Sequence, residues 1–463
     1  MASLEIGNTV PISKIPENDR TNEMRNVFAA IHKKEPDFYV RVPGRVNLIG
    51  EHIDYCGYSV CPMALEQDIL LAVAIDDGQK LILHNLDEKF DDFDCDIKDF
   101  EITIGEGSPK WYQYFLCGVR GVLEVLPQNR PIKGMRIVVS GTVPQSAGLS
   151  SSSALVSAAA LATSHTHEFS MSKEKIANLC AECERYIGTQ GGGMDQAIAF
   201  LATEGCAKLI EFAPLRSTDV VLPSGAVFVI AHSLTKLNKA ATADFNCRVV
   251  ECRLAAQIMA QKLVLPWSEI KTLGQLQQAL SLDLDAMIIL VKEALRERPY
   301  SKEEVVAELR TTSDMLDETS LTLNTRHIES FKLRQRALHV FQEALRVKKF
   351  VEACSNCSSS NSLKTLETLG RLMTYSHVSL RDLYECSHPQ LDSLVDMSKE
   401  YTLGTRLTGA GWGGCVVSLL LPERVEEYVE FLKREFYKGL GVVDGFAEIL
   451  FSTSPQGGAC IYL

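Results

Sequence analysis

The amino-acid sequence predicts a two-domain α+β protein, and two observations support this prediction. The chain has 463 residues, which at roughly 100 to 200 residues per domain suggests two or three domains. Strand-like and helix-like segments alternate up to residue 235, helices dominate from residue 236, and the end of the chain returns to strands around a helix. We therefore expect a mixed-sheet N-terminal domain over residues 1–235, a helix-rich α+β C-terminal domain over residues 236–463, and an active site between them.

The individual elements follow from the spacing of apolar residues. β-branched and apolar runs predict strands over residues 38–49, 68–75, 80–86, 135–139 and 226–232. Helical spacing in the first half predicts helices over residues 112–126, 151–163 and 173–187. Helical spacing in the second half predicts helices over residues 240–263, 283–295, 302–309, 331–347 and 423–437.

The composition excludes several classes of function. The 47 Lys and Arg residues against 59 Asp and Glu give a formal charge of −12, so the chain lacks the basic surface that nucleic acid requires. The longest apolar stretches, such as residues 415–421, fall far short of the roughly 20 residues that span a bilayer. The sequence does not open with a secretory signal, so we expect a cytoplasmic protein whose 14 cysteines are reduced thiols.

Residues 44–55 (GRVNLIGEHIDY) place three polar side chains directly after a predicted strand. Glu51, His52 and Asp54 lie within four positions, and the strand before them carries Arg45. Two carboxylates and an imidazole can bond to several hydroxyl groups, as binding of a sugar requires. A solvated turn is the alternative, which glycines on both sides of the apolar segment disfavour.

Residues 148–154 (GLSSSSA) join a glycine to four serines that lead into an alanine-rich predicted helix. Gly148 permits close approach of the backbone to a ligand, and the N–H groups of a first helical turn form an anion site. Four hydroxyl groups exceed what one helix cap needs, so the segment predicts a phosphate cradle with a hydroxyl available to Mg²⁺. A plain capped helix is the alternative. The P-loop pattern GxxxxGK[ST] is absent from the chain.

Two further segments carry glycines beside candidate functional groups. Residues 407–415 (LTGAGWGGC) match G-x-G-x-x-G but lead into a predicted strand, which excludes a dinucleotide site of the Rossmann type. Two interpretations of this segment remain: a turn that lets the backbone approach a ligand, and a plain structural turn. Residues 191–193 are glycines that end a predicted helix and present Asp195. Asp195 is a candidate general base, given the phosphate cradle and the cationic Arg45; a turn residue is the alternative.

Together these segments resemble the GHMP kinase superfamily, which is named for galactokinase, homoserine kinase, mevalonate kinase and phosphomevalonate kinase. Residues 44–55 resemble the galactokinase signature, residues 148–154 the phosphate loop of the superfamily, and residues 407–415 its third motif. Residues 376–385 (SHVSLRDLYE) are also similar to galactokinases. The resemblance runs from about residue 38 to the C-terminus with the motifs in the family's order. It implies the two-domain GHMP kinase fold.

Within the galactokinase family, the local sequence at four places resembles the branch that phosphorylates N-acetylgalactosamine. Residues 53–58 read IDYCGY where galactokinases usually read TDYNGG. Residues 191–195 read GGGMD, residues 237–242 read LNKAAT, and Phe245 stands where galactokinases carry a tyrosine. Since an acetamido group at C2 is bulkier than a hydroxyl and partly apolar, we expect a reshaped pocket.

The resemblance implies transfer of the γ-phosphoryl group of ATP to the anomeric hydroxyl of N-acetylgalactosamine, which gives the α-1-phosphate and ADP. Asp195 would accept or polarise the proton of that hydroxyl, and Arg45 would stabilise charge on the transferring phosphoryl group. The other implied contacts are Glu51, His52, Asp54 and Asn238 for the sugar; Gly148, Ser150, Ser151 and Lys239 for the nucleotide; and Ser150, Ser151 and Glu184 for Mg²⁺.

Three functions are consistent with these motifs. The leading interpretation is an N-acetylgalactosamine kinase with weaker galactose activity, and the second is an ordinary galactokinase. The third is a catalytically silent sugar and ATP sensor, which the intact serine stretch and the presence of Arg45 and Asp195 disfavour. We expect a monomer that binds small molecules and has neither nucleic acid nor membrane as a partner.

Overall fold

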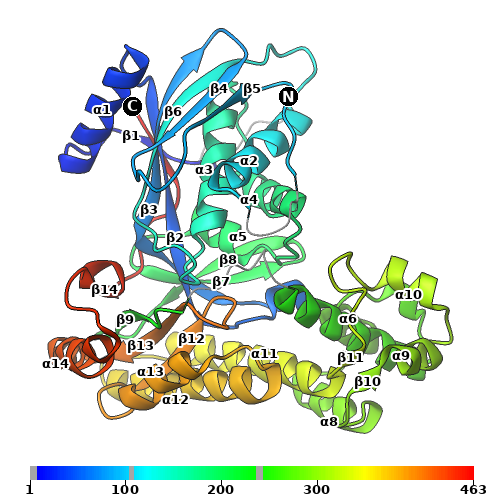
Figure 1. Ribbon diagram of the computed structural model, residues 1–463. Helices are drawn as coiled ribbons and strands as arrows, with labels where there is room; N and C mark the ends of the chain where they lie inside the picture. Colours follow the sequence, from blue (N-terminus) through cyan, green and yellow to red (C-terminus); the bar gives the residue numbers. More distant parts are fainter. Residues whose placement is uncertain (1–7, 104–108, 236–242) are drawn as a thin grey trace.

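The computed structural model describes residues 8–103, 109–235 and 243–463 and confirms the expected α+β class, with a mixed sheet and a helix-rich region after it in the sequence. A seven-stranded sheet with helices on both faces forms the upper part of the molecule in Figure 1. A four-stranded sheet beside a layer of long helices forms the lower part.

The large sheet is mixed, as predicted. Its strand order is β1-β15-β2-β3-β6-β4-β5. The pairs β1 with β15 and β4 with β6 are parallel, whereas the other neighbouring pairs are antiparallel. The bounds are β1 Ile12–Ser13, β2 Phe38–Ile49, β3 Cys61–Asp76, β4 Lys80–Asn85, β5 Phe93–Asp96, β6 Gly134–Gly141 and β15 Cys460–Tyr462.

The direction of the side chains alternates along β3, which explains why helices cover both faces of this sheet. Successive strand residues point to opposite faces. Leu71 packs in the core formed with α2 (Trp111–Val125) and α3 (Ser151–Thr166). Leu70 packs in a separate core with α1 (Asp19–His32), which lies on the opposite face (Figure 1).

The second sheet is antiparallel throughout, in the order β12-β13-β9-β14. Its bounds are β9 Val227–His232, β12 Gly404–Thr408, β13 Cys415–Leu420 and β14 Leu450–Thr453. Two further two-stranded antiparallel sheets are β7 Cys206–Phe212 with β8 Leu215–Val221, and β10 Tyr300–Ser301 with β11 Ser330–Phe331. The other helices are α4 Lys173–Cys183, α5 Met194–Leu201, α6 Asp244–Lys262, α7 Leu273–Leu280, α8 Leu284–Ala294, α9 Lys302–Leu309, α10 Ser313–Thr319, α11 Leu333–Ser355, α12 Ser362–Ser379, α13 Pro389–Ser398 and α14 Val425–Leu432. Among the described residues, no helix is both long and apolar enough to cross a membrane.

Some predicted elements differ from the structure at their ends. β3 begins at Cys61 rather than at residue 68. Asp68 lies inside the strand, where it is paired with Arg20 and Arg41, so this polar residue does not mark the start of the strand. The helix predicted over residues 173–187 ends at Cys183, and a 3₁₀ turn continues it to residue 187.

Strand pairing crosses the division expected at residue 235. β9 precedes that residue yet pairs with β13 and β14 in the second sheet. β15 comes from the far end of the sequence and pairs with β2 in the large sheet. A single division of the chain therefore does not describe the two sheets, and the boundary at residue 235 stays a prediction.

Candidate active site

The loop between β6 and α3 has a strained backbone. Ser146, Gly148 and Ser150 have φ of 53°, 71° and 64°, a left-handed region that costs non-glycine residues roughly 1–2 kcal/mol each. Ser150 takes the N-cap position of α3, but its hydroxyl makes no cap hydrogen bond. The interpretation of this serine as a plain helix cap is therefore wrong, because its side chain accepts no hydrogen bond from the first turn of α3. Its Oγ is buried without a hydrogen-bond partner in the described structure, which is rare in folded proteins and fits a ligand oxygen or a cation.

This loop packs closely against the glycine turn that joins β12 to β13. A Cβ atom on Gly148 would lie 2.7 Å from the carbonyl oxygen of Thr408, and one on Gly409 would lie 2.5 Å from the carbonyl oxygen of Gly148. Only glycine lets two backbones approach this closely. The third motif therefore holds backbone of the second sheet against the phosphate loop, and the strand that follows it confirms that it is not a Rossmann turn.

Arg45 and Asp195 form a buried salt bridge beside the phosphate loop. Arg45 Nε donates to Asp195 Oδ1 at 2.7 Å, and the two side chains are 5% and 12% exposed. Arg45 also donates to the carbonyl oxygen of Gly148. Because Arg45 comes from β2 and Asp195 from the first turn of α5, the fold brings together a cation and a carboxylate that are far apart in the sequence and fixes both beside the phosphate loop.

Behind this pair lies a second acidic side chain, Glu184. Ser153 Oγ donates to Glu184 Oε2 at 2.8 Å and lies 3.4 Å from Asp195 Oδ2. Gln196 Nε2 donates to the same Glu184 oxygen. The predicted metal carboxylate and the predicted base are therefore connected through one buried hydroxyl group.

The sugar-signature loop follows β2 and is largely buried. Glu51 Oε2 is 2.8 Å from Arg406 Nη2, and both residues are almost fully buried. Burial raises the pKa of Glu51, and the nearby Arg406 and Arg45 oppose that effect. The glycine run before Asp195 packs on the same loop, since a Cβ atom on Gly192 would lie 2.6 Å from Asp54 Cγ.

His52 has protein partners at both ring nitrogens. Nε2 lies 2.9 Å from the carbonyl oxygen of Ala410, and Nδ1 lies 2.7 Å from the hydroxyl of Tyr55. Because a carbonyl only accepts, Nε2 carries the proton and donates to Ala410. His52 therefore connects the sugar loop to the third motif, and its role as a direct ligand of a sugar hydroxyl stays a prediction.

The segment at residues 376–385 holds the sugar-signature loop in place through two buried side chains. Glu343 accepts hydrogen bonds from Gly50 N at 2.9 Å and from Ser376 Oγ at 2.6 Å. His339 Nε2 lies 3.1 Å from the carbonyl oxygen of Glu51, and its Nδ1 lies 2.8 Å from Ser379 Oγ. Ser376 and Ser379 therefore hold two buried side chains that bond to the backbone of the adjacent residues 50 and 51.

Two cavities meet at the salt bridge. The larger cavity is lined by the phosphate loop, including Gly148, Ser150 and Ser151, and also by Arg45 and Asp195. The smaller cavity is lined by residues that include Arg45, Glu51, His52, Asp54, Glu184, Asp195 and Phe245. The fold thus brings together every predicted site residue that the structure describes, while Asn238 and Lys239 lie outside the described residues.

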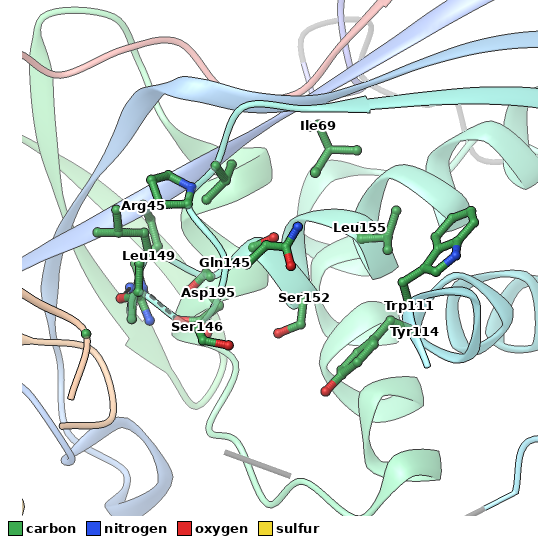
Figure 2. A pocket seen from close by; sticks show the side chains of 18 of the residues that line it. Arg45, Ile69, Trp111, Tyr114, Gln145, Ser146, Leu149, Ser152, Leu155 and Asp195 are labelled. Atoms are coloured by element: carbon green, nitrogen blue, oxygen red, sulfur yellow. Dashed lines mark hydrogen bonds and ion pairs between the residues drawn. The ribbon is translucent and has the colours of Figure 1, made fainter. Parts of the chain in front are cut away.

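Several residues of the site were not predicted from the sequence. Trp111 and Tyr114 form the end of the larger cavity away from Arg45 and Asp195, as Figure 2 shows. Their position at the start of α2 carries no local signal, because aromatic residues on a helix are usually core. Arg406 was also missed, and Ser153 was predicted only as part of the serine run and not for its contact with Glu184, since the partners of both side chains are distant in sequence.

These features define a kinase of the GHMP class, and the sequence comparisons agree. Residues 114–203 match the N-terminal domain of GHMP kinases, and residues 350–438 match their C-terminal domain. Residues 26–75 match the galactokinase galactose-binding signature.

Whole-chain relatives identify the family. The galactokinase of Dictyostelium discoideum is 39% identical, with 96% of this chain and 94% of the relative covered. The galactokinase of Saccharomyces cerevisiae is 33% identical, with 94% and 93% covered. The chain therefore belongs to the galactokinase family, and it is an enzyme of the sugar kinase type.

A solved structure agrees on the fold. The galactokinase of Lactococcus lactis, in its complex with galactose, superimposes with a TM-score of 0.73 at 21% identity, over 95% of this chain and 99% of that one.

Proposed function

We propose that the chain transfers the γ-phosphoryl group of ATP to the anomeric hydroxyl group of a galactose-type sugar. The observation that supports this most directly is the position of the Arg45–Asp195 salt bridge, which lines both cavities. Phosphoryl transfer requires the acceptor hydroxyl in line with the transferring group. A carboxylate in the shared wall can contact that hydroxyl while it faces the phosphate loop.

Asp195 would accept the proton of the sugar hydroxyl as the new bond to phosphorus forms. Arg45 at 2.7 Å favours the ionised carboxylate and would stabilise negative charge on the transferring phosphoryl group. Since this reaction depends mainly on alignment and charge neutralisation, a weak base is sufficient.

The larger cavity accommodates the two chemically different ends of ATP. Gly148, Ser150 and Ser151 would bind the phosphates, and the aromatic rings of Trp111 and Tyr114 would contact the adenine. Ser150, Ser151 and Glu184 would hold Mg²⁺, which prefers oxygen ligands; the buried Ser150 hydroxyl without a partner fits that role. When bound, Mg²⁺ would neutralise charge on the phosphate oxygens. Lys239 remains a proposed further contact to the nucleotide.

Galactose is the acceptor that the relatives favour. Two whole-chain relatives, 39% and 33% identical, are named galactokinases, and the matching signature is described as galactose-binding. Glu51, His52 and Asp54 would form the polar wall of its site.

N-acetylgalactosamine is the second candidate, and the sugar cavity itself favours it. Phe245 lines that cavity, with its ring centre 5.6 Å from that of His52 and 5.5 Å from that of Tyr55. It presents an apolar ring where, by the resemblance, galactokinases carry a tyrosine hydroxyl. The methyl group of an acetamido substituent suits such a surface. Asn238 remains a proposed contact near the C2 substituent.

A coupled assay of ADP release, run with each sugar at the same low concentration, tests the activity and the choice of sugar. We expect turnover with at least one sugar, and ³¹P NMR should show a phosphate ester at C1. A preference for galactose of about tenfold or more in kcat/KM would identify an ordinary galactokinase, and the reverse preference would identify an N-acetylgalactosamine kinase. Binding of both sugars without ADP release would identify the silent sensor instead.

A variant of the proposed base gives the matching control. Asp195→Asn should abolish turnover while sugar binding, measured by calorimetry, stays close to that of the wild type. Turnover near the wild-type rate would show that another group accepts the proton. The monomeric state and the cytoplasmic location stay predictions alongside this function.

A further inference from the structure

Ser153 lies between two carboxylates that have different proposed roles. It belongs to the first turn of α3 and is 2% exposed. Its hydroxyl donates to Glu184 Oε2 at 2.8 Å and lies 3.4 Å from Asp195 Oδ2. This buried hydroxyl therefore connects the two carboxylates, in addition to its place in the first turn of the helix.

Glu184 receives a second hydrogen bond at the same oxygen. Gln196, the residue after Asp195 on α5, donates to Glu184 Oε2 through its buried side-chain amide. Two donors from different helices fix the plane of the Glu184 carboxylate before any ligand arrives. Such outer partners orient the groups that hold a metal, and their loss typically weakens metal binding or activity by 10–100-fold.

The hydroxyl of Ser153 can serve one carboxylate at a time. A serine hydroxyl carries a single proton and rotates about its C–O bond. The two distances assign that proton to Glu184 in this structure. If a cation takes electron density from Glu184, the same proton can turn toward Asp195 without any movement of the backbone.

We propose that Ser153 is a positioning residue for both carboxylates. It orients Glu184 toward the cation that accompanies the nucleotide, and it becomes a hydrogen-bond donor to Asp195 once that cation is bound. This inference rests on the proposed function, because it uses the roles proposed there for Glu184 and Asp195.

The test compares Ser153→Ala with Ser157→Ala. Ser157 lies one turn further along the same helix, is fully buried, and makes no hydrogen bond to a carboxylate in the described structure. Calorimetry measures binding of a non-hydrolysable ATP analogue, once with Mg²⁺ and once with EDTA. We expect Ser153→Ala to weaken binding of the Mg²⁺ complex about tenfold and to leave binding of the metal-free analogue unchanged. Ser157→Ala should match the wild type in both.

A double-mutant cycle separates action through Glu184 from a general structural effect. In a Glu184→Gln background, Ser153→Ala should change binding of the Mg²⁺ complex less than about twofold, since its partner is already altered. In steady-state assays, Ser153→Ala should lower kcat about tenfold with the KM for sugar nearly unchanged.

Three results would overturn the inference. Binding of the Mg²⁺ complex by Ser153→Ala could equal that of the wild type, the metal-free analogue could lose affinity equally, or the loss could persist in full in the Glu184→Gln background. Failure of the proposed function is a separate result, because it would appear as a wild-type protein that phosphorylates neither sugar.

Discussion

Replacement of Arg406 by methionine should destabilise the protein by about 3–5 kcal/mol, the usual effect of removing one partner of a buried ion pair. Arg406 is 0% exposed and Glu51 is 2% exposed, so water cannot replace the lost contact. Its Nη2 lies 2.8 Å from Glu51 Oε2, and its Nη1 donates to the carbonyl oxygen of Asn47 at 2.7 Å. Methionine has a similar length but no donors, and it leaves Glu51 as a buried charge without its nearest cation.

The destabilisation should depend on pH in a definite direction. Burial already raises the pKa of Glu51 above its ordinary value of 4.5, and Arg406 opposes that effect. Without Arg406 the pKa rises further, so the folded variant keeps a proton that the unfolded chain loses. Its free energy of unfolding therefore falls as pH rises from about 4.5 toward the new folded pKa. The difference between variant and wild type should be larger near pH 8 than near pH 5.

Urea unfolding followed by circular dichroism measures the effect, with Glu51→Gln/Arg406→Met as the matched control. The double variant removes both charges, so it should recover most of the lost free energy. A loss of less than about 1 kcal/mol for Arg406→Met, or a double variant no more stable than the single one, would refute the reasoning. Either result would show that water or a local shift satisfies Glu51.

Three further predictions follow from other contacts. Gly148→Ala should weaken nucleotide binding and lower the thermal midpoint, because it adds about 1 kcal/mol of backbone strain and places Cβ 2.7 Å from the Thr408 carbonyl oxygen; Gly439→Ala, with open space around it, is the control for calorimetry and melting. Burial lowers the pKa of His339 to about 4, so the unfolded chain takes up the proton first and stability should fall by up to about 3 kcal/mol between pH 6.5 and 4. His339→Gln should flatten that slope in urea titrations, and an unchanged slope would contradict the assignment. Phe245→Tyr should shift the kcat/KM ratio toward galactose by about tenfold, and an unchanged ratio would exclude this ring from sugar selection.

The prediction of the fold from sequence succeeded where the signal is local. The β-branched run at residues 38–49 and the alanine-rich run after Ser150 predict β2 and α3 because burial and helix propensity act on neighbouring residues. The start of β3 was missed, since Asp68 resembles a strand end unless Arg20 and Arg41 are known to pair with it.

The candidate site was predictable in its motifs but not in its supporting contacts. The segments that carry Arg45, Glu51 and Asp195 have recognisable sequence motifs, and the fold brings these segments together. Arg406 has no such signal, because its partner Glu51 is 355 positions away. The direction of the Ser153 hydroxyl likewise depends on how α3 packs against Glu184, which no run of four serines can show.

The pairing of β15 with β2 sets a constraint on the order of folding during synthesis. β2 ends at Ile49, yet its neighbour in the sheet is residues 460–462, and β1 pairs with those residues rather than with β2. The ribosome therefore produces about 400 residues after β2 before that edge of β2 can be covered. Until then the nascent chain exposes an unpaired strand edge, the kind of surface that promotes aggregation.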